Sequence, residues 1–327
     1  MAFAAVLLHL RPASRGSGLP SAQLVIVGSL EVSQVGGSEA FCSLAGLAVG
    51  DAFGGRILLP GDHPSVLGRQ LPSAPWAWSD DTEMACSVFD VLTRHGHLDQ
   101  EALAANFATH YNPDRGYGAG VARLLLQFRD GDSWRRTAAT AFGGQGSWGN
   151  GAAMRVAPLG AWMHHDLDLA AYQAELSAVV THAHPDAVAG AIAVAVAAAT
   201  AAATPDISGP ALLEAVLTKV PPGRVCDGIK TATTLTGADP REAAAALGAG
   251  REIAAHDTVP LSLWIAACHL GDYADALWTV AQLAEDVDTV GAIVGGIVAA
   301  GTGLAGIPDT WRAACEPLPA WLPHLGL

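Results

Sequence analysis

Short alanine-rich segments, separated by glycine, proline or asparagine, make up most of this 327-residue chain. Alanine is the strongest helix former, whereas glycine and proline end helices. The alternation of β-branched and polar residues that is typical of strands is rare. Aromatic residues, at 6%, are also few. With no fixed-period repeat and no interior linker, the pattern predicts an all-α protein built as a single domain of many short to medium helices.

Fourteen segments carry this helical pattern. They span residues 41–50, 82–95, 98–109, 118–128, 134–141, 152–163, 168–181, 186–203, 209–220, 226–236, 240–247, 259–270, 273–284 and 290–301. Residues 24–27 have the composition of a short strand, but one strand makes no sheet. Residues 1–36 are rich in Gly, Ser and Pro, so we expect a flexible or disordered leader, followed by the domain at residues 37–327.

Composition and charge narrow the classes of function. Hydrophobic residues form 51% of the chain, enough for a large core. The formal net charge of −14 disfavours nucleic-acid binding, and an anionic ligand would need help from cations, helix N-termini or backbone N–H groups. The apolar segment 188–203 is short and only weakly hydrophobic, which favours a buried helix over a membrane span. We therefore expect no membrane partner, and a monomer by default.

The cysteines indicate a compartment. There are five of them, widely spaced and without a CxxC motif. An odd number at such spacing is typical of reduced thiols, not of a disulfide framework or a zinc ribbon. The apolar first ten residues lack the basic region of a signal peptide. The sequence thus predicts a cytoplasmic protein.

Two short runs of oxygen-bearing side chains stand out. The first is SDDT at residues 79–82, and the second is DVDT at residues 286–289. Carboxylates crowded this closely repel each other unless a positive charge lies between them. An all-oxygen set suits a hard cation such as Mg²⁺, Mn²⁺ or Ca²⁺ and not zinc. If the two runs meet in space, they form a metal site.

Each run precedes a predicted helix. Asp286 and Asp288 would point to nearly opposite sides of a helix, so we expect both to lie in a turn or extended segment if they face one ion. Asp80 and Asp81 stand in the same position before the helix at 82–95. Either run alone is explained well enough by ordinary N-capping. Two such runs, each with a doubled carboxylate, favour the metal site.

A third feature is the glycine-rich loop GGQGSWGNG at residues 143–151. Its glycines allow backbone N–H groups to approach an anion closely. Phe142 and Trp148 flank the first half of the loop, where they can stack on a base. The alternative is a mobile linker, against which a tryptophan and the predicted helix at 152–163 favour an ordered loop. The loop is neither a Walker loop nor GxGxxG after a strand.

Two further polar segments remain open. His182 and His184, in THAHPD, follow a predicted helix, where a histidine serves either as a ligand contact or as a cap. The glycine-rich turn DRGYG at residues 114–118 is either part of the site or structural, with Arg115 paired in the interior.

Six segments resemble the ADP-ribosylglycohydrolase family. GLAVGDAFGG, WSDDTEM, PDRGYGAGV, GSWGNGAAMRVAPLG, TH and DVDTVGAIVGGIVAA occur here in the family's order and span roughly residues 41–308. The chain looks most like the branch whose animal member cleaves serine-linked ADP-ribose. The resemblance implies an all-α orthogonal bundle around two Mg²⁺ (or Mn²⁺) ions. It also implies a hydrolase that releases ADP-ribose from an ADP-ribosylated protein or small-molecule conjugate.

The resemblance also assigns residues to the site. It implies an adenine sandwich between Phe142 and Trp148, an apolar nucleoside contact by Ile253, and a ligand contact by His182. The implied pyrophosphate and ribose loop comprises Gln145, Gly146, Ser147, Trp148, Gly149, Asn150 and Gly151. The implied metal ligands are Ser79, Asp80, Asp81, Asp286, Asp288 and Thr289. Asp80, Asp81 and Asp288 are the expected catalytic residues, with Asp81 or Asp288 accepting the proton of the attacking water.

One position departs from the family pattern. Many members carry a Glu seven residues after the Asp of the Gly-Asp motif, and counting from Asp51 gives Leu58. This departure favours an alternative, an ADP-ribose-binding protein with little turnover. A second alternative is a metal-stabilised helical protein without a nucleotide ligand. The leaving group stays open among arginine, serine, threonine, acetate and a base.

Overall fold

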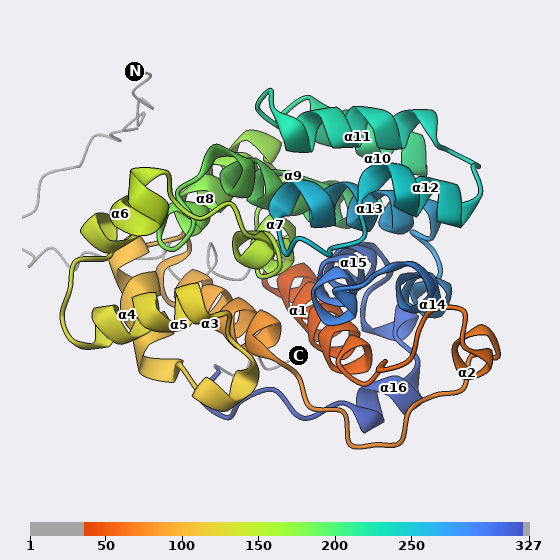
Figure 1. Ribbon diagram of the computed structural model, residues 1–327, viewed down its shortest axis with the longest axis horizontal. Coiled ribbons are helices and arrows are strands. Elements are labelled where there is room, and N and C mark those ends of the chain that lie inside the picture. Colours follow the sequence, from red (N-terminus) through yellow and green to blue (C-terminus); the bar gives the residue numbers. More distant parts are fainter. Residues whose placement is uncertain (1–35, 323–327) are drawn as a thin grey trace, which may run out of the picture.

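The computed structural model describes residues 36–322. The predicted leader, apart from Gly36, and the possible strand at 24–27 lie outside the described residues. Within them the protein is helical and without β-strands, as predicted, and only two isolated bridges join extended backbone, Trp76 to Cys315 and Gly149 to Ala254. Figure 1 shows one body of helices that cross at many angles.

The α-helices have the following bounds: α1 Gly37–Gly54, α2 Pro64–Leu67, α3 Asp80–His95, α4 Gln100–His110, α5 Ala119–Arg129, α6 Trp134–Gly144, α7 Ala157–Trp162, α8 Leu167–Val179, α9 Pro185–Ala203, α10 Gly209–Leu217, α11 Arg224–Thr234, α12 Pro240–Leu247, α13 Ala255–Cys268, α14 Tyr273–Leu283, α15 Val287–Thr302 and α16 Asp309–Ala314. Three short 3-10 helices, η1 Pro113–Arg115, η2 Asn150–Ala152 and η3 Leu304–Gly306, complete the set.

Local sequence explains where the helices begin and end. The Ser79 side chain caps α3 by accepting from the Asp81 N–H, and Gly96 ends the helix in the left-handed conformation with φ 72°. Asp99 caps α4 in the same way. At α9, His184 is the cap and Pro185 occupies the first turn, where its missing N–H does no harm.

Two short helices were missed from the sequence, and one predicted helix is partly wrong. The helices α2 and α16 were not predicted, because four and six residues are too few to show a helical period. The predicted helix at 152–163 is wrong over its first part: η2 ends at Ala152 and α7 begins only at Ala157. The residues between these two helices, 153–156, are not helical, and they include Arg155, whose side chain is fully buried.

The core lies where α1, α7, α9, α13 and α15 pack together (Figure 1). In the described part of the chain, α9 is long and apolar enough to cross a membrane, but 83% of its most apolar stretch is buried inside the protein. It therefore forms part of the core, as its alanine-rich sequence predicted.

The most extensive helix contact in the core joins α1 and α15, which lie side by side at the centre of Figure 1 although they are far apart in the sequence. A Cβ atom added to Gly50 would lie 2.1 Å from the Gly291 carbonyl oxygen, and one added to Gly46 would lie 2.4 Å from that of Gly295. The paired glycines run in opposite directions, so the helices are antiparallel. Only glycine allows this approach, which brings Asp51 next to the start of α15.

Candidate active site

Three carboxylates meet where α1, α3 and α15 converge. Asp51 of α1, Asp81 of α3 and Asp288 of α15 each present one oxygen, and these oxygens lie within 4.8 Å of one another. The structure thus brings the two acidic runs together. It adds Asp51, which the sequence analysis did not include in the site because it stands alone, without a neighbouring carboxylate.

Asp51 organises the first acidic run. Its Oδ2 accepts hydrogen bonds from the Ser79 N–H at 2.9 Å, the Thr82 N–H at 3.1 Å and the Thr82 hydroxyl at 2.5 Å. The Ser79 hydroxyl donates to Asp81 Oδ2 at 2.8 Å. Asp80 and Asp81 lie in the first turn of α3, not before it as expected, and the helix N-terminus favours their charge.

The second run has a different geometry from the one predicted. Asp286 is the N-cap of α15 and has non-helical backbone angles, whereas Asp288 lies in the first helical turn. The expectation that both lie in a turn is therefore wrong for Asp288. Asn150 donates to Asp286 Oδ2 at 2.7 Å and so positions this carboxylate. Thr289 is buried, and its N–H donates to Asp288 Oδ1 at 2.9 Å.

The electrostatics of the cluster fit a cation. Burial, the largest effect, and repulsion by neighbouring carboxylates raise the pKa values of Asp51, Asp80 and Asp286 to about 7, and the same causes raise the pKa of Asp81 well above its usual range. Asp81 Oδ1 is buried without a hydrogen-bond partner among the described residues. A hard cation would satisfy this oxygen and replace the protons that such carboxyls otherwise hold.

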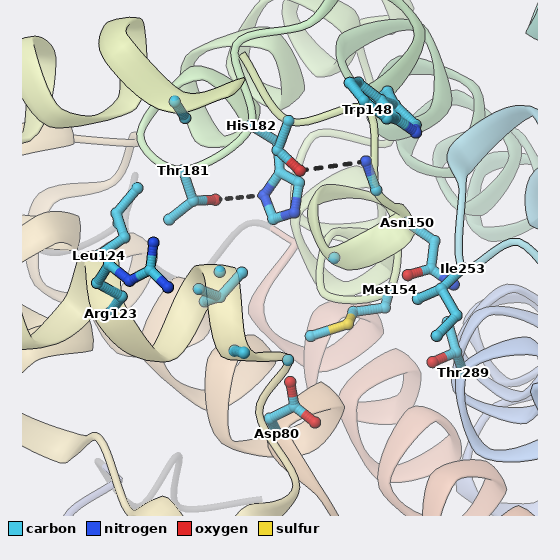
Figure 2. Close-up of a pocket in the computed structure, with 18 of the residues that line it drawn as sticks. Asp80, Arg123, Leu124, Trp148, Asn150, Met154, Thr181, His182, Ile253 and Thr289 are labelled. Atoms are coloured by element: carbon cyan, nitrogen blue, oxygen red, sulfur yellow. Dashed lines mark hydrogen bonds between the residues drawn. The ribbon is translucent and has the colours of Figure 1, made fainter. Parts of the chain in front are cut away.

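A pocket of about 840 Å³ opens above the cluster and has the size of a site for a small organic ligand. In Figure 2, Asp80 lies toward the lower side, Trp148 at the upper right and Arg123 on the left. Asp80, Asp81, Asp286, Asp288 and Thr289 all line this pocket. Ser79 caps α3 and is not part of the wall.

The glycine-rich loop forms another side of the pocket. Ser147, Trp148, Gly149, Asn150 and Gly151 line it, whereas Gln145 and Gly146 lie outside the wall. The loop is ordered by pairing with the segment before α13: the Asn150 N–H donates to the Ile253 carbonyl at 3.2 Å, and the Ala255 N–H donates to the Trp148 carbonyl at 3.0 Å.

Three exposed apolar side chains line the outer pocket. Phe142 is 56% exposed and Ile253 63% exposed, and both have the left-handed backbone conformation that is uncommon for such residues. Local strain of this kind often accompanies binding sites. The rings of Phe142 and Trp148 are 4.9 Å apart at an angle of 45°. That spacing leaves no room for a base between them, so a sandwich requires the rings to separate.

The acidic side chains of the pocket wall outnumber its basic ones, since five carboxylates line it together with one arginine. Arg123, from α5, is its sole Arg or Lys among the described residues. His182 also lines the wall and is 2% exposed, and burial lowers its pKa to about 3, so it is neutral.

Two residues considered from the sequence lie outside the pocket wall. Leu58 is 84% exposed in the connection after α1. Arg115 stacks on the Trp78 ring, 3.3 Å from its centroid, and forms two 2.8 Å hydrogen bonds with Glu316. Of the two interpretations of the turn at residues 114–118, the structural one therefore holds for Arg115.

Several known proteins are similar to this chain in sequence. The sequence profile of the ADP-ribosylglycohydrolase family matches residues 38–326. An uncharacterized protein of Archaeoglobus fulgidus is 30% identical, over 82% of this chain and 88% of that protein. ADP-ribosylhydrolase ARH3 of Danio rerio is 27% identical, over 84% of each chain. ADP-ribosylarginine hydrolase Tri1 of Pseudomonas putida is 25% identical, over 86% of this chain and 74% of its own.

A solved structure agrees with these sequence matches. A chain of an ADP-ribosylglycohydrolase-related protein complex superposes with a TM-score of 0.59 at 25% identity, covering 86% of this chain and 94% of its own. Fold and site define a single-domain helical protein with a carboxylate-lined pocket, which is the architecture predicted from the sequence. The chain belongs to the ADP-ribosylglycohydrolase family. Membership and the named relatives support an ADP-ribosyl hydrolase.

Proposed function

We propose that this protein is a Mg²⁺-dependent hydrolase that releases ADP-ribose from an ADP-ribosylated protein or small-molecule conjugate. The observation that carries the proposal is the juxtaposition, in one pocket, of a carboxylate cluster with a glycine-rich loop and two aromatic rings. The carboxylates suit a cation that holds ribose hydroxyls, the loop suits a pyrophosphate, and the rings suit a base.

The metal ligands in this proposal are Asp51, Asp81 and Asp288 at the centre, with Asp80, Asp286 and Thr289 around them. Two Mg²⁺ or Mn²⁺ ions, when bound, would orient the sugar and stabilise negative charge. Ser79 serves as the cap of α3 and as a donor to Asp81.

The reaction is hydrolysis at the anomeric carbon. The oxygen of water forms a bond to that carbon, and the bond to the acceptor breaks. Asp81 or Asp288 accepts the proton that the water releases, while the leaving group takes up one proton. Solvent water is the proposed source of that proton, because Asp80, as a metal ligand, is ionised when the cation is bound.

The carboxylates of the pocket repel the anionic pyrophosphate of the ligand, so binding needs positive charge or N–H donors elsewhere in the wall. Arg123 supplies a permanent positive charge in the wall, and the N–H groups at the start of α5 and in the glycine-rich loop are donors for phosphate oxygens. We further propose a monomer in the cytoplasm. All five cysteines are free thiols, which suits a reducing compartment.

The experiment is a linkage panel. Purified protein with Mg²⁺ is mixed with substrates ADP-ribosylated on arginine, serine, threonine, acetate or a base, and released ADP-ribose is measured. We expect release from at least one linkage, abolished by a chelator and by Asp80→Ala but not by Asp130→Ala, which changes an exposed aspartate.

Two outcomes would contradict the proposal that this protein is an enzyme. ADP-ribose binding without release on any linkage would favour the binding-protein alternative. No ligand effect would favour the metal-stabilised helical protein. Ligand at 100 times its Kd stabilises the folded state by about 2.7 kcal/mol, enough for a clear shift in Tm.

A further inference from the structure

A buried arginine lies beneath the pocket without a carboxylate partner. Arg155 is fully buried and forms no ion pair within residues 36–322. Its Nη2 donates to the Ser177 carbonyl at 2.7 Å, and its guanidinium lies 4.8 Å from the centroid of the Phe107 ring. Burial lowers its pKa to about 9, so it is still charged at neutral pH. An unpaired buried charge is unfavourable, which points to a task beyond packing.

The other terminal nitrogen of Arg155 starts a chain of hydrogen bonds. Nη1 donates to the Thr181 hydroxyl at 2.9 Å and to the Gly151 carbonyl at 3.2 Å. The Thr181 hydroxyl lies 2.7 Å from His182 Nδ1, a contact drawn as a dashed line in Figure 2. A guanidinium can only donate, so the Thr181 oxygen accepts from Arg155.

This direction fixes the protons further along. The hydroxyl of Thr181 has one proton, and His182 Nδ1 is the partner that the structure offers it. A nitrogen that accepts a hydrogen bond carries no proton, so the proton of the neutral His182 ring lies on Nε2. In the opposite tautomer, Arg155 Nη1 and His182 Nδ1 would both donate to the Thr181 hydroxyl oxygen. The proton of the Thr181 hydroxyl would then have no acceptor among the described residues.

His182 Nε2 faces the glycine-rich loop at the pocket wall. A Cβ atom added to Gly151 would lie 3.0 Å from this nitrogen, and one added to Gly149 would lie 3.4 Å from it. Both glycines therefore leave the Nε2 edge of the ring uncovered by side chains. No hydrogen bond within the described residues uses Nε2, which leaves its N–H available for a ligand in the pocket.

We propose that Arg155 is a positioning residue that acts through Thr181. The two residues hold His182 as a neutral imidazole whose Nε2–H donates to an oxygen of the ligand. In this arrangement His182 is a fixed donor and does not shuttle protons. That the oxygen belongs to the pyrophosphate or a ribose of ADP-ribose rests on the proposed function, whereas the tautomer does not.

The tautomer can be measured directly in the ligand-free protein. Nitrogen-15 NMR distinguishes protonated from unprotonated ring nitrogens, and a His182→Asn variant identifies the His182 signals among those of the 12 histidines. We expect an unprotonated Nδ1 and a protonated Nε2 in the wild type between about pH 5 and pH 8, because His182 stays neutral there. A proton on Nδ1 would overturn the proposal.

Variants test the chain of hydrogen bonds. Thr181→Val keeps the shape but removes the hydroxyl, so we expect a mixture of tautomers and an about tenfold weaker affinity for ADP-ribose, the effect of one lost hydrogen bond to a charged ligand. Thr181→Ser restores the hydroxyl and should restore the single tautomer. The matched control is Thr200→Val, since Thr200 is buried and its hydroxyl bonds only within α9.

Arg155→Met tests whether the guanidinium sets the direction of the hydrogen bond between Thr181 and His182. Without the guanidinium, Thr181 is free to accept as well as donate, so both tautomers should appear if the variant folds. Circular dichroism checks folding, and the Thr181 variants decide the question if Arg155→Met does not fold. If folded Thr181→Val keeps a single Nε2–H tautomer and an unchanged affinity for ADP-ribose, the proposed action of Arg155 through Thr181 on His182 is refuted. Failure of the wild type to bind ADP-ribose would count against the proposed function alone.

Discussion

Asp51 joins two helices and the carboxylate cluster through one side chain. Its oxygens accept from the backbone of Ser79 and from Thr82, at the start of α3, while an oxygen also faces Asp81 and Asp288. Such a residue both contributes to a metal site and orients the other ligands, and the loss of an orienting contact typically weakens metal binding by about 10- to 100-fold.

We therefore predict that Asp51→Asn weakens Mg²⁺ binding by at least about tenfold. The amide keeps the size of the side chain but removes the charge and places an N–H₂ group among donors. Calorimetry or the Mg²⁺-dependent shift in Tm measures the effect. Asp62→Asn, which changes an exposed aspartate after α1, is the control. Wild-type Mg²⁺ affinity in Asp51→Asn would exclude Asp51 as a ligand.

For Leu58 we predict the opposite, a substitution with little effect. Its side chain is 84% exposed and does not line the pocket. Leu58→Ala should thus leave the rate of ADP-ribose release within about twofold of wild type, as is usual for surface substitutions. A rate of ADP-ribose release that is lower by tenfold or more, which corresponds to about 1.4 kcal/mol of activation free energy, would mean that this residue reaches the site during turnover.

At the level of helices, the glycine contact between α1 and α15 sets the geometry of the site. Gly50 precedes Asp51, and Gly291 follows Asp288 by one turn, so the close approach of the helices also fixes the separation of these carboxylates. A change in helix spacing should therefore affect both stability and metal binding.

Gly50→Ala tests this coupling. Its Cβ would lie 2.1 Å from the Gly291 carbonyl oxygen, and overpacking of this kind costs about 1–3 kcal/mol. We expect a Tm lower by several degrees and a smaller Mg²⁺-dependent shift. Gly271→Ala is the control, because a Cβ there meets no atom within 4 Å. Equal Tm values and equal Mg²⁺ shifts in the two variants would show that α1 and α15 can separate without effect.

Most helices, but not this contact, were predictable. Capping residues such as Ser79 and Asp99, and Pro185 in the first turn of α9, mark helix starts in the sequence itself, so the long helices were found with small errors at their ends. The two acidic runs were recognised for the same reason, since each is local. Asp51 was missed because its partners are distant in sequence. The spacing of Gly46 and Gly50, repeated at Gly291 and Gly295, was the available signal.

For the molecule as a whole, the buried carboxylates link stability to pH. Asp51, Asp80 and Asp286 have pKa values of about 7 in the folded protein, whereas an unfolded aspartate titrates near 3.9. The folded state therefore binds more protons between these values. The stability that these groups contribute is fully present at low pH and is lost as pH rises through about 7 in metal-free protein.

Cations compete with those protons, which gives a prediction about metal removal. The increase in Tm on adding Mg²⁺ should be several degrees at about pH 8 and much smaller at about pH 5.5, where protons already occupy the carboxyls. Differential scanning fluorimetry with and without chelator measures it at each pH, so that unrelated surface groups cancel. An equal shift at both pH values would contradict a proton-linked metal site.

The antiparallel pairing of α1 with α15 also has a consequence for biosynthesis. The ribosome releases Asp51 early and Asp288 only when nearly all of the described chain has been made. At about 5–20 residues per second, the interval is on the order of 10–50 s. During that time the nascent protein has Asp51 and Asp81 but lacks Asp288, so the three-carboxylate centre is incomplete, and a chain terminated before α15 would lack the centre on which the proposed hydrolysis depends. The centre can therefore assemble only after the start of α15 has been synthesised.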